Sequence, residues 1–593
     1  MRVVLMLALM AQTLSAQPLP GVRAAITKAL PILQRSASEF VSRRACVSCH
    51  HNILPILTLH LAQSRGITID ATVLRAVEDK TFRALQAPNA LDDAIQATAI
   101  NDPTPNDSDL LMAAHEAGLR PDLAAAVYAR RLVRWQRDGH WVTSDFRPPH
   151  SSSFFMTTAT AVRAIRFYMP GELSAERNAS IRSARQWLFE NRPASAEDAA
   201  FRVMGLVWAE ASSDDIAAAA RDLSAMQKPG GGWPQLAGYE PDAYSTGEAL
   251  FALHEAGVQA SDAAWSKGAK FLISAQAQDG TWRVHTRMVS PADVSPKYFP
   301  TGFPYGKDEF LSYAGSSWAV LALLSGLPES PAKPQPQSQL SMNPESPSWM
   351  RTVLFGTPQQ LVSLLEAGLD PNSRTPNGTT ILMAAAPDVE KVRLLLDRGA
   401  HARDRAASGQ DALTIAAAYR GSAASIQALL DAGADAEPPE STRVRNAPLV
   451  LASMTGDIEN VKLLLARGAR SLESALSQAV TFGYPEIART LIAAGANAGI
   501  VASAGVNLLH WAAITNRSAL IPVLAEAHVP INAMDDSGYT PLMYAATIDF
   551  GDTDVLKALL NAGADKKIRN SEGRTPLAQA QHYKHSLLEA ALR

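Results

Sequence analysis

The phrase GYTPLMYA, from Gly538 to Ala545, decides the fold of the C-terminal part of this chain because it recurs. Similar phrases are GTTILMAA, which starts at Gly378, and GRTPLAQA, which starts at Gly573. Weaker copies of the phrase occur as well. The spacings between successive central leucines are 31, 36, 27, 33, 33 and 35 residues. These leucines are Leu382, Leu413, Leu449, Leu476, Leu509, Leu542 and Leu577. This period predicts a stack of repeated helical units.

A second signature lies between these phrases: a pair of leucines followed by a glycine. It reads LLDRG at 395–399, LLDAG at 429–433 and LLNAG at 559–563. The Thr-Pro of the first signature caps and starts a helix. The leucine pair closes a second helix, and the glycine supplies its left-handed C-cap. One such pair of helices cannot bury its apolar face alone, so we expect the pairs to stack.

The two signatures, recurring in phase, resemble ankyrin repeats, about seven of them across residues 349–593. The resemblance implies an all-α solenoid that binds a protein partner through its hairpin tips and concave helix faces. The short step around Leu476 predicts a trimmed hairpin between Arg470 and Ser474. We predict that polar residues at the hairpin tips contact the partner: Asn372, Ser373, Arg374, Asp404, Arg405, Asp535, Asp536, Arg569 and Asn570.

The N-terminal region repeats as well, and its marker is tryptophan. The phrase FLISAQAQDGTW ends at Trp282, and shorter copies with Gln and Gly before the tryptophan end at Trp233 and Trp141. These tryptophans are 49 and 92 residues apart, and a degenerate copy near Trp187 divides the longer interval. Each phrase predicts a helix that ends in glutamine, then a glycine turn, then the tryptophan.

These phrases resemble the QW motifs of squalene-hopene cyclases and related α/α-toroid proteins. The resemblance covers roughly Ala24 to Gly326 and implies a barrel of helical hairpins, in two concentric rings, around a cavity. It also implies that Gln and Trp brace neighbouring units and that the cavity takes an apolar or glycan-like ligand. We therefore expect a toroid over 17–327, a stiff proline-rich linker over 328–348 and the repeat stack over 349–593.

The chain departs from the cyclases at the catalytic acid, which in that family lies in an Asp-x-Asp-Asp phrase. The phrase Asp107-Ser108-Asp109 lacks the third acid, and Asp214-Asp215 fits a helix start. A protonating acid needs a neighbouring carboxylate that tunes its pKa, and the sequence shows no such pair. We assign no catalytic residue, and a terpene or squalene cyclase stays an alternative.

The two cysteines of the chain form the phrase Cys46-Val47-Ser48-Cys49-His50. This spacing is typical of covalent haem c attachment, in which two thiols add to the vinyl groups and the histidine ligates the iron. The hypothesis makes Cys46, Cys49 and His50 cofactor-binding residues and His50 a ligand of the haem iron. The spacing does not choose a sixth ligand among four candidates: His60, Met112, His115 and Met156.

Other interpretations of the cysteine phrase remain open. A disulfide or redox pair needs only the two thiols, and a zinc ion could take Cys46, Cys49, His50 and His51. The apolar helical run that follows, from Asn52 to Ala62, fits a toroid helix better than a compact cytochrome. A haem would then sit on the toroid itself.

The N-terminus and the overall charge limit where the protein acts. Residues 1–16 have a short basic start, an apolar run and a cleavage region ending at Ala16, which predicts an export signal. We expect a periplasmic or secreted bacterial protein without an integral membrane segment once the signal is removed. A net charge of -3 gives no reason to expect a nucleic-acid partner.

The leading hypothesis is an exported scaffold protein, with an ankyrin stack for a protein partner beside a non-cyclase toroid that could carry a haem. The sequence favours binding over catalysis and leaves an enzymatic role open. A periplasmic c-type haem protein, which transfers electrons or acts as an enzyme, is the alternative that rests on the cysteine phrase alone.

Overall fold

In the computed structural model the chain is mostly helical, with one two-residue strand pair, β1 (Trp233–Pro234) and β2 (Pro241–Asp242), among the described residues. The structure describes residues 19–44, 50–97, 102–144, 153–287, 300–329, 346–439 and 447–593. The predicted signal, the two cysteines and most of the predicted linker lie outside these ranges. The all-α fold class is confirmed.

The N-terminal helices close into a ring, which we call the barrel. Each inner helix contacts the next, and the last returns to the first. In chain order the inner helices of the described residues are α2 (His50–Ser64), α6 (Pro103–Glu116), α8 (Phe154–Tyr168), α10 (Ala196–Trp208), α12 (Ala243–Glu255) and α14 (Glu309–Ser325). Because a returning helix separates successive inner helices, the inner helices all run in one direction.

A second layer of helices surrounds this ring. Each outer helix packs on the inner helices beside it. These helices are α1 (Val22–Arg43), α3 (Ala71–Thr81), α7 (Leu123–Trp135), α9 (Ser174–Glu190), α11 (Ser213–Ala225) and α13 (Ala263–Ala275). Short elements complete the barrel: α4 (Arg83–Gln86), α5 (Ala90–Gln96), η1 (Gly171–Leu173) and η2 (Gly306–Asp308).

The glutamines of the predicted braces tie neighbouring outer helices together. Each side-chain amide donates to a carbonyl of its own glycine turn and to a carbonyl of another outer helix. The sets are Gln136 with Gly139 and Ser180, Gln227 with Gly231 and Ala264, and Gln276 with Gly280 and Ala25. The last set joins the end of the ring to α1, so it closes the barrel.

The tryptophans of the same phrases fasten outer helices to inner ones. The indole nitrogens of Trp141, Trp233 and Trp282 each donate to a carbonyl in the last turns of their own outer helix, at 2.7 Å. Their backbone N–H groups donate to a hydroxyl on an inner helix, for example from Trp233 to Thr246. Trp187 makes no such brace, because its ring stacks on His140 at 4.8 Å.

The glycine in each brace turn is required by geometry. Gly231 has φ +95°, and a Cβ there would collide with the carbonyl oxygen of Lys267 on the next outer helix. Gly280 has φ +91° and faces Lys28 in the same way. Only glycine combines a left-handed backbone with this close approach.

The C-terminal region is a stack of helical pairs. The first helices of the described pairs are α15 (Met350–Phe355), α17 (Ile381–Ala385), α19 (Ala412–Ala417), α21 (Pro448–Thr455), α23 (Leu472–Phe482), α25 (Leu508–Ile514), α27 (Pro541–Thr547) and α29 (Pro576–His582). The second helices are α16 (Pro358–Glu366), α18 (Val389–Asp397), α20 (Ala423–Asp431), α22 (Ile458–Ala466), α24 (Pro485–Ala493), α26 (Leu520–Glu526), α28 (Asp554–Asn561) and α30 (Ser586–Leu592). A short turn of helix, η3 (Ser503–Gly505), lies in one hairpin.

The described stack holds eight pairs, one more than the predicted count of about seven. The first pair, α15 and α16, lacks the Thr-Pro phrase ahead of α15, but its second helix ends in the leucine-pair signature at 364–368. The predicted caps are present: Thr380 and Thr540 accept from the backbone N–H groups of Met383 and Met543. The trimmed hairpin is confirmed, since α23 begins six residues after α22 ends (472 minus 466).

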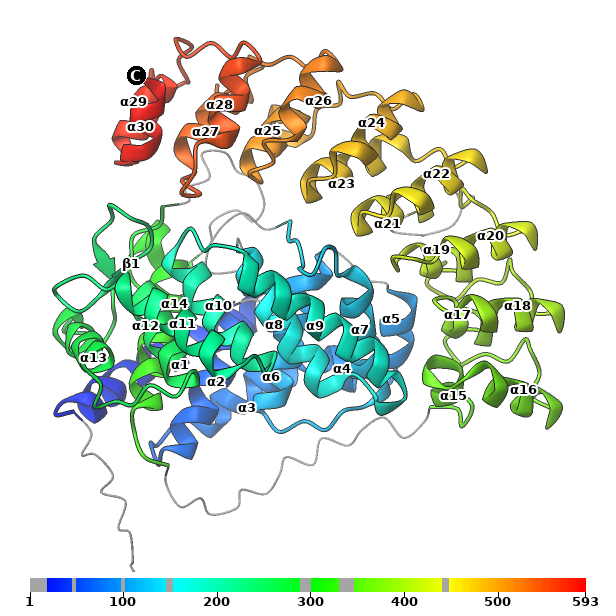
Figure 1. The fold of residues 1–593 in the computed structure, drawn as a ribbon, viewed down its shortest axis with the longest axis horizontal. Coiled ribbons are helices and arrows are strands. Elements are labelled where there is room, and N and C mark those ends of the chain that lie inside the picture. The colour runs from blue at the N-terminus through cyan, green and yellow to red at the C-terminus, as the bar shows by residue number, and fades with distance from the viewer. Residues whose placement is uncertain are drawn as a thin grey trace, which may run out of the picture.

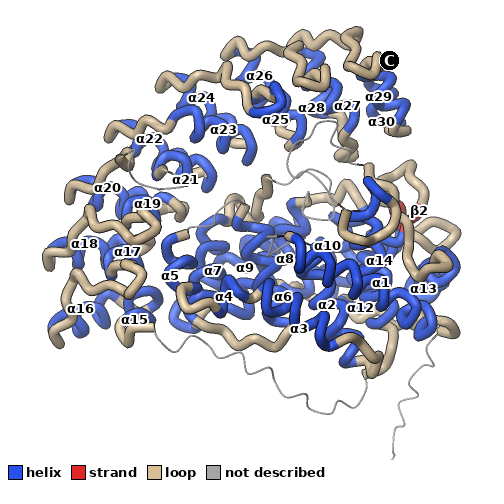
Figure 2. Tube along the Cα trace, turned by 180° about the vertical axis from the view of Figure 1, so that it is seen from behind, coloured by secondary structure: helices blue, strands red, loops and turns tan. Residues whose placement is uncertain are grey.

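The stack arcs around the barrel with its first helices nearest to it (Figure 1). From behind, the second helices lie on the far side of the arc, away from the barrel (Figure 2). Among the helices of the described ranges, none has both the length and the apolar character needed to cross a bilayer.

Candidate functional site

The concave side of the stack is occupied by the barrel of the same chain. Helix α5 contacts α17, and residues from α7 and the loops ahead of α8, α12 and α14 contact the turns between first and second helices. Trp135, at the end of α7, donates from its indole to the carbonyl of Ala418 at 2.9 Å and meets Phe482 edge to face. The face that ankyrin-type stacks offer to a partner is therefore used within the chain.

A buried ion pair lies at the centre of this contact. Arg130 of α7, only 4% exposed, donates to Asp388 at 2.5 Å and to the carbonyl of Leu354 at 2.9 Å. Lys391 also pairs with Asp388, at 3.2 Å. Burial lowers the pKa of the Arg130 guanidinium, but Asp388, together with Glu176 and Tyr419, raises it, so the net shift is upward. Both charges are held in place by their partners.

A hydrogen-bonded cluster secures the first repeats to α5. Asp92, itself buried, accepts from the hydroxyls of Thr375 and Thr379 and from the amide of Asn377 at 2.7 Å. Gln96 donates to Thr379 at 2.6 Å and accepts from Ser408. The tips of two hairpins are thus bound by the barrel.

The last repeats touch the rim where the inner helices begin. Tyr239 donates to the carboxylate of Asp549 at 2.8 Å, and Arg287 donates to the Asp549 carbonyl. Arg517 reaches the carbonyl of Thr143 and lies over the Phe154 ring, 5.6 Å from its centroid. The stack covers part of this rim.

The predicted partner residues differ in availability. Asp535 and Asn570 are buried and hold their own hairpins, since Asp535 accepts from Tyr544 at 2.7 Å. Arg405 is held by Asp411, and Asn372 bridges to Gly399 and His401 of the next repeat.

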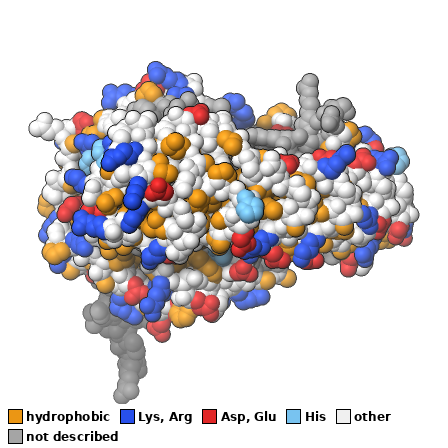
Figure 3. All heavy atoms as spheres, turned by 90° about the horizontal axis from the view of Figure 1, so that it is seen from above, with side chains coloured by type: hydrophobic (Ala, Val, Ile, Leu, Met, Phe, Trp, Pro, Cys, Tyr) orange, Lys and Arg blue, Asp and Glu red, His pale blue; other side chains and the backbone are white. Residues whose placement is uncertain are grey.

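Three of the predicted positions face solvent, and so do two apolar residues that the prediction left out. Arg374, which pairs with Asp404 at 2.7 Å, is exposed, as are Asp536 and Arg569. Val501 and Met534 occupy the same place in successive hairpins, 33 residues apart, and are 62% and 57% exposed. Charged side chains of both signs are interspersed over the face seen in Figure 3.

Comparison with known proteins identifies this part of the chain. A family model described as "Ankyrin repeats (3 copies)" matches residues 349–440, 388–474, 476–570 and 509–592. Residues 349–592 are ankyrin repeats. The chain is 32% identical to an ankyrin repeat-containing protein of Treponema pallidum over 126 residues, which is 21% of this chain and 42% of that protein. It is 46% identical to one of Schizosaccharomyces pombe over 46 residues, which is 8% of this chain and 21% of that protein.

All of the residues matched by the family model lie in the ankyrin stack. The chain spans less than half the length of the curated relatives that it matches. Kinship of the barrel with the cyclases therefore stays a prediction from the tryptophan phrases, although its helices close into the expected ring.

A cavity of about 150 Å³ lies inside the barrel and is lined by all of the inner helices named above. Its wall is apolar around Leu54, Met112 and Met156, with the aromatic rings of Phe201, Phe251, Trp208 and Trp318. Whereas His50, Asp109 and Thr160 lie farther back, six of its polar residues lie toward the C-terminal ends of the inner helices: Arg65, Glu116, Arg163, His254, Glu255 and Ser325. This end is opposite to the rim that the ankyrin repeats cover.

Only some of the candidate haem residues lie within the described ranges, and only some of those line the cavity. Cys46 and Cys49 lie outside the described residues. His50 begins α2 and lines the cavity, as do Met112 and Met156, two of the four proposed sixth ligands. Of the other two, His60 contacts Glu78 at 2.6 Å and His115 stacks on Phe167 at 3.5 Å. Only the methionines share a space with His50.

A haem does not fit the cavity as it stands. A cavity of about 150 Å³ takes a ligand of about the size of benzene, whereas a porphyrin is several times larger. The His50 ring is also packed, 4.4 Å from His51 and 5.7 Å from Phe310. His51 lies between Phe40 and Tyr313, at 4.8 and 3.8 Å, and burial lowers its pKa to about 3.

The structure brings together an acid pair that sequence reasoning missed. Glu197 on α10 and Glu248 on α12 lie close enough to interact, beside Tyr244. Burial first, and Glu197 second, raise the pKa of Glu248 well above its ordinary value, which favours the neutral acid. The expectation that the chain lacks paired carboxylates was wrong, because this pair comes from different helices. Their 51-residue separation (248 minus 197) left no local signal.

Two of the four acids that the sequence singled out are used structurally. Asp107 accepts from two N–H groups of the Arg131 guanidinium, at 2.8 and 2.7 Å. Asp215 lies in the first turn of α11, where its backbone N–H donates to the capping hydroxyl of Ser212.

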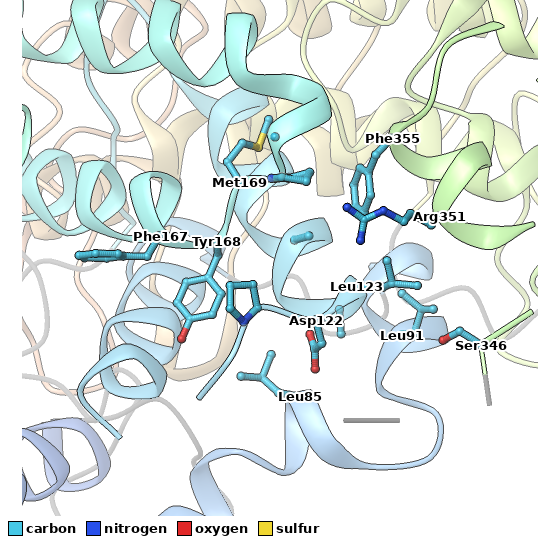
Figure 4. A pocket seen from close by; sticks show the side chains of 15 residues that line it. Leu85, Leu91, Asp122, Leu123, Phe167, Tyr168, Met169, Ser346, Arg351 and Phe355 are labelled. Carbon is cyan, nitrogen blue, oxygen red and sulfur yellow. The ribbon is translucent and has the colours of Figure 1, made fainter. Parts of the chain in front are cut away.

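A further pocket, of about 400 Å³, lies where the barrel meets the first ankyrin pair (Figure 4). Leu85, Leu91 and Met169 come from the barrel, and Phe355 comes from α15. Its charged groups are already engaged: Arg351 pairs with Glu172 at 2.7 Å, and Asp122 caps α7 through Ala125. It is a gap between two packed surfaces.

Proposed function

We propose that this protein is a binding scaffold that recognises a protein partner through the exposed hairpins of its last ankyrin repeats. The observation that carries the proposal is the occupied concave face. Since the barrel holds the inner side of the stack through Arg130 and Trp135, a partner must use the outer side and the hairpin tips.

The hairpins at 498–507, 531–540 and 565–575 form the best-suited surface. They carry the exposed Val501 and Met534 next to the predicted polar contacts Asp536 and Arg569. Interfaces combine an apolar centre with a polar rim, and this surface offers both. The hairpin tips of the earlier repeats are partly bound to Asp92 and Gln96.

A photo-crosslinking amino acid at position 534 tests the proposal in cells that make the full chain. We expect a discrete adduct with another protein, and we expect Val501→Glu to abolish it. The matched control places the same crosslinker at Phe189, an apolar residue of outer helix α9 that is 51% exposed. Equal adducts from both positions, or none from position 534, contradict the proposal.

We also propose export and an oxidising environment for Cys46 and Cys49, as the first 16 residues predict. The His50, Met112 and Met156 side chains support a haem beside the cavity, and the small cavity volume opposes a haem within it. The intact mass of the mature protein decides both points. Cleavage after Ala16 shortens the chain, and a covalent haem adds about 616 Da; a disulfide instead removes two hydrogens.

A further inference from the structure

We propose that the cavity of the barrel binds a compact organic cation, of the quaternary-ammonium class, between aromatic rings and the Glu255 carboxylate. The rings are those of Trp208, Phe251 and Trp318. This goes beyond the protein-binding function and uses a different part of the molecule.

The cavity wall is rich in aromatic surface. The Phe251 and Trp318 rings meet edge to face at 5.6 Å, and Phe201 and Trp318 do so at 6.1 Å. Phe251 is only half-buried although it points into the barrel, because the cavity exposes it. Aromatic faces attract cations through the ring quadrupole, most strongly when the site excludes water.

In the cavity wall, one cationic side chain of the protein already contacts both an aromatic ring and a carboxylate. The Arg163 guanidinium lies 4.6 Å from the centre of the Trp208 ring and pairs with Glu116. The protein therefore uses these rings to hold a cation next to a carboxylate.

Another carboxylate of the cavity wall, that of Glu255, lies among aromatic rings. Glu255 accepts from the indole nitrogen of Trp208 at 3.0 Å, and no lysine or arginine of the described ranges forms an ion pair with it. Arg65, also in the wall, pairs with Glu329 at 3.2 Å. Burial lowers the pKa of His254, which favours its neutral form despite Glu255. A bound cation would complete the same arrangement here.

The position and size of the cavity favour a small ion. Glu248, Phe251 and Glu255 follow one another at i, i+3 and i+7 on α12, so they share its inward face. A volume of about 150 Å³ suits tetramethylammonium or choline and excludes longer ligands.

Calorimetric titration of the purified full chain with choline, and with its neutral isostere 3,3-dimethylbutan-1-ol, tests the proposal. We expect choline to bind at one site, at least tenfold more tightly than the isostere, because only choline carries the charge. Equal affinities, or no saturable choline binding, overturn it. This comparison needs no variant.

Glu255→Gln sharpens the test because the amide can still accept from Trp208. We expect about tenfold weaker choline binding with little change for the isostere. Glu190→Gln, on the outer ring, is the matched control and should bind choline as the parent does. If Glu255→Gln and Trp318→Leu both retain full affinity, the cation does not bind at these rings and the proposal fails.

Discussion

The barrel and the ankyrin stack are both built from repeated helical pairs, but the barrel closes and the stack does not. In the barrel three of the outer helices are fastened to the next by a glutamine, and one of these, Gln276, joins the last unit to α1. The stack does not close on itself, and its first helices rest against the barrel. In a closed ring every unit has two neighbours, whereas a stack of repeats is held by the interfaces between successive pairs.

The largest effect should come from breaking the contact between the two regions. Asp388→Ala leaves the buried Arg130 guanidinium without its carboxylate, so we expect a loss of about 3–5 kcal/mol in the free energy of unfolding of the ankyrin stack. Urea denaturation and hydrogen exchange over α15 to α19 measure it. Asp431→Ala, which removes an exposed pair with Arg467 on the outer side, is the control and should change nothing measurable. Similar stability of the two variants contradicts the account.

A smaller effect distinguishes the glycines of the two regions. Gly231 in the barrel and Gly563 in the stack have nearly the same φ, +95° and +94°, but only Gly231 faces a backbone carbonyl that a Cβ would strike. We expect Gly563→Ala to cost about 1 kcal/mol, for the left-handed backbone alone. Gly231→Ala should cost about 3 kcal/mol, since collision adds to strain. Equal costs in thermal unfolding argue against close packing of the outer helices.

Loss of the glutamine brace that closes the ring should lower the free energy of unfolding by less than Gly231→Ala does. Gln276→Leu removes two hydrogen bonds, to Ala25 and Gly280, and should lower barrel stability by about 2 kcal/mol. Gln186 lies in the degenerate phrase and bonds only to Glu190 on its own helix among the described residues, so Gln186→Leu is the control. If both variants unfold alike in urea, the glutamine braces are not what closes the barrel.

The smallest effect is that of a single hydrogen bond between the regions. Trp135→Phe keeps an aromatic ring against Phe482 and deletes the donor to the Ala418 carbonyl, so we expect a loss of about 1 kcal/mol. Trp187→Phe, at a ring that stacks on His140, should change stability less. The reverse order in the same denaturation experiment contradicts the role given to Trp135.

Much of the fold could be predicted because its signals are local and repeat. The Thr-Pro and Leu-Leu-x-x-Gly phrases located the ankyrin helices, and the Gln–Gly–Trp phrases located the outer turns of the barrel. The predicted count was one short because no cap phrase precedes α15, although a Leu-Leu-x-x-Gly phrase at 364–368 marks α16. Helix α15 packs against the barrel through the Leu354 carbonyl.

The sites were less predictable because they form between elements that are distant in sequence. Arg130 and Asp388 are 258 residues apart, and no sequence pattern around either residue predicts that they pair. Asp535 looked like a binding residue because it lies at a hairpin tip, but its carboxylate is needed by Tyr539 and Tyr544. The partners of a polar residue decide its role, and only the three-dimensional structure shows those partners.

The central claim is that the barrel fills the concave side of the ankyrin stack, and a double-mutant cycle on Arg130 and Asp388 tests it most directly. The free energy of unfolding is measured for the parent chain, Arg130→Met, Asp388→Ala and the double variant. We predict an interaction free energy of about 2–3 kcal/mol between the two positions, because the charges meet in a buried contact. Additive effects, with an interaction free energy near zero, would show that the two regions do not pack together in this way.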